Sequence, residues 1–182
     1  RHQRQRASVA KTFTPTDLAK VLDSVETISR EVIDDFCERG EVDLVEALSQ
    51  PFPLLVICDM MGIPRSEFHT VLNATNIILS GGDPEFIGDG DPMTAILGAG
   101  IELTALMDEL SAERRKNPTD DLTSKLVHAD VDGEMLAPEE VAPFFILLAV
   151  AGNDTTRTAI SHGMNLLAQH PEQRAVWQND VE

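Results

Sequence analysis

A polar run inside an otherwise apolar helix is the part of this sequence best suited to chemistry. The apolar stretch at residues 141–151 is followed by the sequence GNDTT at residues 152–156. A carboxylate beside a hydroxyl in an apolar wall can hold and pass protons while bulk water is kept out. Asp154 and Thr155 are therefore the candidate catalytic pair.

The same run weakens the helix that carries it. Glycine in a helix interior costs about 1 kcal/mol relative to alanine. The Thr155 hydroxyl can turn back to the carbonyl of Ala151, and with Gly152 this would bend the helix or open its hydrogen-bond ladder into a groove for a diatomic molecule. In the alternative interpretation, Gly152 only permits close packing against another helix, while Asp154 and Thr155 face solvent.

Composition limits the classes of partner. The 182 residues contain 31 Asp plus Glu against 14 Lys plus Arg, a net charge of −17, which argues against nucleic acid or an anionic membrane as a default partner. Residues 1–30 nevertheless carry six basic and three acidic side chains, a local charge of +3 that leaves room for a small anionic ligand. The apolar content, 42 % with 7 Phe, 1 Trp and no Tyr, favours helices.

Several kinds of site lack their signatures. Cys37 and Cys58 fit no zinc spacing and no disulfide scaffold, which is typical of a reducing cytoplasm. No Glu-x-x-His pair, phosphate-binding glycine loop or GxSxG motif occurs. The longest apolar run, residues 141–152, is too short to cross a bilayer.

Apolar periodicity and helix breakers predict a mainly α fold. Helices are predicted at residues 3–12, 18–40, 49–62, 65–80, 93–116, 120–129 and 138–169. Between them we predict an extended or turn segment at 41–48, a loop rich in Gly, Pro and Asp at 81–92, and a turn at 130–138.

The sequence AGNDTT at residues 151–156, inside a long apolar helix, resembles the [AG]Gx[DE]TT signature of the central I helix of the cytochrome P-450 family. The continuation TRTAISHGMNLLAQHPEQR is similar to that of bacterial members. His2 and Arg6 resemble the HxxxR pair of the family's C helix, and residues 81–92 its F–G loop over the substrate channel. The resemblance covers the chain from end to end. It implies a mainly α, partial cytochrome P-450 fold that comprises helices C to J with a long central I helix. Residues 1–182 would form one partial domain that is truncated at both ends.

The resemblance also implies roles. Thr155 would hydrogen-bond the activated oxygen and Asp154 would relay protons from solvent. Ala151 and Gly152 would leave room for dioxygen beside the haem. Two further pairs complete the implied site: His2 and Arg6 would contact the haem propionates, and Leu147 and Val150 would face substrate or, equally well, belong to the core.

The implied activity is that of a bacterial haem-thiolate monooxygenase. It would hydroxylate a hydrophobic small molecule (a sterol side chain, a branched lipid or a terpenoid) in the cytoplasm. The implied cofactor is haem b with its iron, O2 is the co-substrate, and NAD(P)H supplies electrons through a ferredoxin or flavodoxin.

Two family hallmarks do not occur in the 182 residues: the ExxR of the K helix and the FxxGxxxC loop whose thiolate ligates the iron. We therefore expect a segment, less than half of a family member, with no metal ligand of its own and no activity alone. One alternative is a non-catalytic helical interaction module; an open reading frame that continues into both hallmarks would decide for the enzyme. Another is a peroxide-using or dehydratase-type relative, against which the Asp154–Thr155 pair argues.

Overall fold

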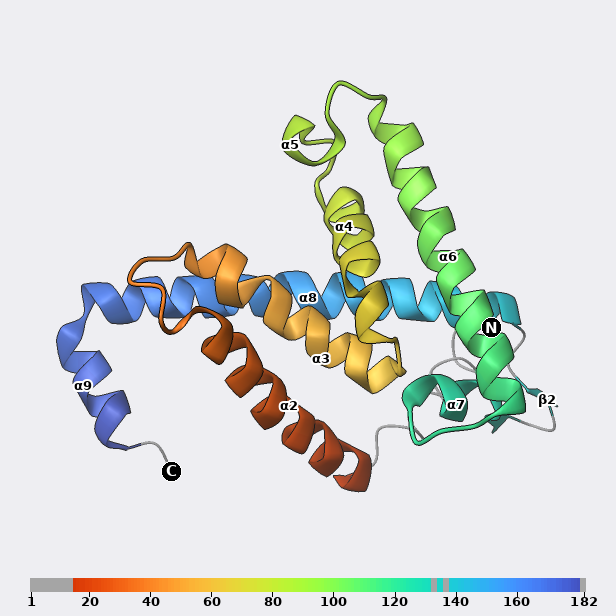
Figure 1. The fold of residues 1–182 in the computed structure, drawn as a ribbon, viewed down its shortest axis with the longest axis horizontal. Coiled ribbons are helices and arrows are strands. Elements are labelled where there is room, and N and C mark those ends of the chain that lie inside the picture. Colours follow the sequence, from red (N-terminus) through yellow and green to blue (C-terminus); the bar gives the residue numbers. More distant parts are fainter. Residues whose placement is uncertain (1–14, 132–133, 136–137, 181–182) are drawn as a thin grey trace.

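The longest helix, α8 (Pro138–Gln169), lies at the centre, and most of the other helices pack along it (Figure 1). The computed structural model describes residues 15–131, 134–135 and 138–180. The other elements, in chain order, are α2 (Pro15–Phe36), η1 (Val45–Ser49), α3 (Pro51–Met61), η2 (Arg65–Glu67), α4 (Phe68–Leu79), α5 (Pro84–Ile87), α6 (Pro92–Lys116), α7 (Leu122–Val127), β1 (Asp130–Val131), β2 (Glu134–Met135) and α9 (Pro171–Asn179). The predicted helix at 3–12 lies outside the described residues.

The core forms where α3, α4, α6 and α7 meet α8. α3 is apolar nearly all round because it is covered on several sides, by α2, α8 and α4. In Figure 1, α3 lies along α8, α2 slopes beneath α3, and α4 and α6 rise together from α8. The largest fully buried apolar side chains come from these five helices and α2: Ile28, Leu54, Met61, Val71, Leu103, Met107, Leu126, Val127, Val141 and Phe145.

A buried ion pair joins the ends of three helices. α3 ends at Gly62, whose φ of 73° is readily adopted only by glycine. The carboxylate of Asp121 occupies the place where a Cβ at Gly62 would stand. Arg114 binds both groups: its Nε donates to Asp121 at 2.5 Å and its Nη2 to the Gly62 carbonyl at 2.9 Å. This contact fixes α6 and α7 relative to α3, and through α3 relative to α8.

Most of the predicted helices are confirmed, with their ends shifted by a few residues. Three predictions between them differ from the structure. From Leu44 onward the 41–48 segment is helical, because the Asp43 carboxylate accepts hydrogen bonds from the Val45 and Glu46 amides and so nucleates η1. The predicted loop at 81–92 contains the short helix α5, which the Asp83 side chain caps in the same way. The predicted turn at 130–138 contains a two-stranded antiparallel pair with Asp130 opposite Met135.

Candidate functional site

One face of α8 is uncovered, and it carries three of the predicted site residues. Leu147, Ala151 and Thr155 recur at four-residue steps and are all exposed; Thr158 extends the same face by one turn. Leu147 is 65 % exposed, so it does not belong to the core of the described part. We call Leu147, Ala151, Thr155 and Thr158 the exposed face of α8. Val150 and Asp154, at its edge, are half-buried.

The expected back-bond from Thr155 is present. Its hydroxyl donates to the carbonyl of Ala151 at 2.8 Å. The helix nevertheless stays regular through residues 151–156, so the ladder does not open as the sequence suggested. The packed surroundings of α8 outweigh the low helix propensity of this turn. Because the hydroxyl uses its proton toward the backbone, its oxygen lone pairs remain available to accept a hydrogen bond from the exposed side.

The carboxylate of Asp154 is held beside the exposed face. Nη2 of Arg157 donates to its Oδ1 at 2.7 Å, and the two side chains lie one helical turn apart. The Asp154 side chain is 46 % exposed and the Arg157 side chain 24 %. Solvent therefore reaches the carboxylate while the guanidinium restricts where it points.

Gly152 and Asn153 face the interior. A Cβ at Gly152 would lie 3.0 Å from Cδ1 of Ile57, so glycine at this position lets α8 approach α3 closely, as the packing interpretation held. Asn153 is fully buried, and neither its Nδ2 nor its Oδ1 has a hydrogen-bond partner among the described residues. The GNDTT run is thus divided between two sides of one helix.

Neither cysteine lies on the exposed face of α8. Cys58 belongs to α3, where burial raises the pKa of its thiol to about 12 against a smaller opposing effect of Arg65. Cys37 is exposed just after α2. His2 and Arg6 lie outside the described residues, so the structure does not test their predicted contact with the haem propionates.

In the described part of the chain, no group of three or more His, Cys, Asp or Glu side chains is arranged to hold a metal ion. Within the same residues, no helix is long and apolar enough to span a membrane.

Sequence reasoning missed Arg157 and Asn153. The three-residue spacing from Asp154 to Arg157 is an ordinary signal for a helical ion pair and could have been used. Nothing in the sequence signals the burial of Asn153, because Asn is usually exposed and only the packing of neighbouring helices covers it.

No family model matches the chain. Over its whole length it is 42 % identical to a methyl-branched lipid omega-hydroxylase of Mycobacterium tuberculosis, of which it covers 42 %. Over 98 % of its length it is 34 % identical to a steroid C26-monooxygenase of Mycolicibacterium smegmatis, of which it covers 41 %. The chain spans less than half the length of these curated relatives.

Two solved structures are similar as well. A cytochrome P-450 of Mycobacterium marinum in complex with pseudoionone superposes with a TM-score of 0.90 at 38 % identity, over 99 % of this chain and 44 % of that one. A structure from Bacillus megaterium in complex with testosterone gives a TM-score of 0.86 at 28 % identity, over 98 % of this chain and 47 % of that one.

Proposed function

The chain belongs to the cytochrome P-450 family, and on that premise we propose that it is a central segment of a longer haem-thiolate monooxygenase, with α8 as the helix over the haem. The observation that supports this proposal most directly is the exposed face of α8. It combines an apolar side chain, a small residue and a hydroxyl at successive turns, beside a solvent-reached carboxylate. The reaction would insert one oxygen atom of O2 into a C–H bond.

The residues of this face fit a flat apolar cofactor. Ala151 presents only a methyl group, so a planar ring can approach the helix closely at that turn, and Leu147 offers it apolar contact. When bound, haem would supply the oxygen-activating chemistry. Its thiolate ligand would come from elsewhere in the longer protein, because Cys58 is buried in α3 and Cys37 follows α2. The propionate contacts remain assigned to His2 and Arg6, and the space for dioxygen to Ala151; Gly152, which the resemblance gave the same role, faces Ile57 of α3 and serves it only by letting α8 pack closely there.

Proton delivery is the proposed task of Thr155 and Asp154. The hydroxyl donates to the Ala151 carbonyl and can accept at its oxygen, so a small rotation lets it take a proton on one side and give one on the other. Asp154 exchanges protons with solvent through its exposed edge, and Arg157 keeps its carboxylate at that place. Arg157 is in this scheme a positioning residue.

The proposed substrate is a hydrophobic small molecule such as a sterol side chain, a branched lipid or a terpenoid. The relatives are named for methyl-branched lipid and steroid oxidation, and the similar structures hold pseudoionone and testosterone. Leu147 and Val150 are the proposed substrate contacts. Electrons would come from NAD(P)H through a ferredoxin or flavodoxin in the cytoplasm.

Thr155→Ala in the longer enzyme tests the proton role. We expect haem binding to be kept and product formed per electron pair to fall by roughly tenfold or more, with hydrogen peroxide taking up the difference, because a positioned proton donor is lost. Product, peroxide and NAD(P)H consumption are measured together. Thr156→Ala is the matched control, since Thr156 is the neighbouring exposed threonine of α8 and does not belong to the exposed face defined above. Unchanged coupling in Thr155→Ala would show that the proton path runs elsewhere.

A further inference from the structure

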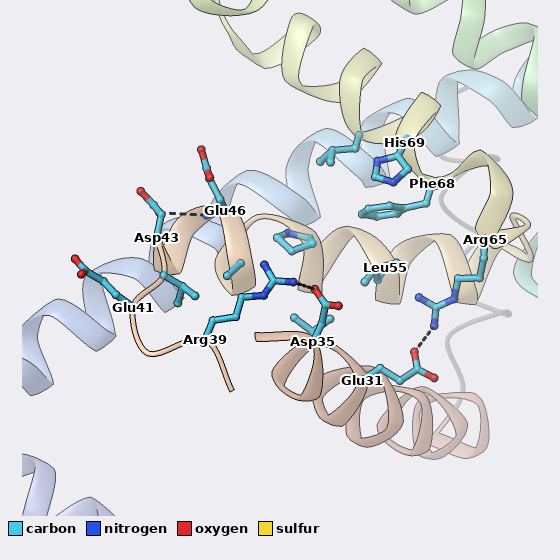
Figure 2. Close-up of a pocket in the computed structure, with 15 residues that line it drawn as sticks. Glu31, Asp35, Arg39, Glu41, Asp43, Glu46, Leu55, Arg65, Phe68 and His69 are labelled. Atoms are coloured by element: carbon cyan, nitrogen blue, oxygen red, sulfur yellow. Dashed lines mark hydrogen bonds and ion pairs between the residues drawn. The ribbon is translucent and has the colours of Figure 1, made fainter. Parts of the chain in front are cut away.

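A groove of about 720 Å³ lies away from the exposed face of α8, between α2, the following segment, η1, α3 and the start of α4 (Figure 2). Of the described residues that line it, none belongs to α8. Its volume falls within the range of about 300–1,000 Å³ that is usual for small-molecule sites. The groove is therefore large enough for a ligand and distinct from the proposed monooxygenase site.

The charged groups of the groove do not balance. Five carboxylates and two guanidinium groups line it. Arg39 pairs with Asp35 and Arg65 pairs with Glu31, each at 3.0 Å, so both cations are already used. The three remaining carboxylates, Glu41, Asp43 and Glu46, gather at the end of the groove beside η1 in Figure 2. Asp43 accepts hydrogen bonds from backbone amides of η1, and in the part of the chain that the structure describes no cation pairs with any of the three carboxylates.

The floor of the groove and part of its other end are apolar, and the Arg65–Glu31 pair lies at that same end (Figure 2). Phe68 stands over Leu55 at the end opposite the three carboxylates (Figure 2), and its ring makes an edge-on contact with His69 at 5.6 Å between centroids. Leu72 of α4 and the buried Val32 of α2 complete this lining. The groove therefore presents excess negative charge at one end, and at the other a partly exposed apolar surface beside a charge-balanced ion pair.

We propose that this groove binds a small organic cation with an apolar body, its charged head beside Glu41, Asp43 and Glu46 and its body over Leu55 and Phe68. Charge complementarity selects the head, because three exposed carboxylates that pair with no described cation repel an anion and attract a cation more than a neutral molecule. The volume and the walls from five elements favour a small molecule over an extended polypeptide, which needs a longer and flatter surface. This inference does not depend on the proposed monooxygenase function.

The test uses the longer protein in its haem-loaded form and the probe (4-phenylbutyl)trimethylammonium. A quaternary ammonium cannot ligate a haem iron. Calorimetry measures binding of the probe, and a visible spectrum recorded in parallel shows whether the haem site is involved. We expect saturable binding without a shift of the Soret band, and little or no binding of 4-phenylbutyrate. The double variant Glu41→Gln, Glu46→Gln should weaken the probe's affinity by roughly three- to tenfold, the sum of two partly exposed charge contacts.

Glu38→Gln is the matched control, because Glu38 is an exposed glutamate close in the chain that does not line the groove. Glu38→Gln should leave the probe's affinity within twofold of that of the parent protein. If the control and the double variant weaken the affinity equally, the effect comes from net charge alone and the proposal is overturned. Absence of saturable binding would also overturn the proposal. So would competition between the probe and a hydrophobic molecule that shifts the Soret band, because the probe would then bind beside the haem. If the probe fails while a lysine-rich peptide binds in a manner sensitive to Glu41 and Glu46, the occupant is a polypeptide and the small-molecule proposal is wrong.

Discussion

Adjacent residues of the GNDTT run have different surroundings because one helix face is packed and the other is not. Thr155 is exposed and bonded to its own backbone, whereas Asn153, two residues earlier, is fully buried. A step of two residues turns the side chain by about 200°, which is enough to separate these environments. The proposed proton delivery therefore rests on Asp154 and Thr155, whereas Gly152 and Asn153 take part in packing.

The two cysteines should react very differently. In native protein at pH 8, we expect iodoacetamide to label Cys37 and to leave Cys58 unmodified until a denaturant is added. Cys58 is 3 % exposed and burial raises the pKa of its thiol to about 12, so only about one molecule in ten thousand carries the thiolate. Peptide mass mapping over time measures both rates. Equal labelling of the two thiols without denaturant would mean that α3 is not packed as described.

At the scale of elements, the position of α8 is set partly by contacts far from its exposed face. α3 packs along α8, and the end of α3 is held by the Arg114–Asp121 pair at Gly62. Burial would raise the pKa of Asp121, but hydrogen bonds from Thr119, Ser124 and Arg114 outweigh it, so the pKa lies below its usual value of 3.8. A carboxyl with a lowered folded-state pKa adds stability above its unfolded pKa, and this stability is lost as pH falls through the folded value.

Asp121→Asn should therefore lower stability at pH 7 by about 3 kcal/mol, because it leaves the Arg114 guanidinium partly buried without its counter-charge. It should also flatten the loss of stability as the pH falls below about 4, because the parent protonates this group only below its ordinary pKa. Urea unfolding of the longer protein across that range gives both quantities. Asp108→Asn, an exposed aspartate on α6, is the control. A variant that keeps the parent's slope in that acidic range would contradict the role given to Asp121.

At the scale of the whole molecule, large apolar side chains remain exposed on α8 and on α9. They include Leu147, Met164, Leu166, Val176 and Trp177, each at least 41 % exposed. Such side chains ordinarily mark a surface that another part of a protein covers. Since the chain spans 42 % of its omega-hydroxylase relative, we expect the rest of the longer protein to cover them.

The 182-residue chain alone should not give the carbon monoxide difference spectrum of a haem-thiolate protein. Neither cysteine stands on the exposed face of α8, so a ring bound there would find no thiolate from this chain. The chain and the longer protein are reconstituted with haem in parallel and reduced under carbon monoxide. A thiolate-type Soret band from the chain alone would contradict both the placement of the cysteines and the proposed division of the site.

The sequence by itself was sufficient to predict the long helix at 138–169, the order of most other helices and the Thr155 back-bond to Ala151. These features depend on local periodicity, caps and hydrogen bonds between residues close in the chain. Only the tertiary structure decided which face of α8 is uncovered, that Gly152 packs on Ile57, that Asn153 is buried, and that Arg114 joins Asp121 to Gly62. Each of these depends on segments far apart in the sequence, and the spacing within one helix does not report which neighbour will cover it.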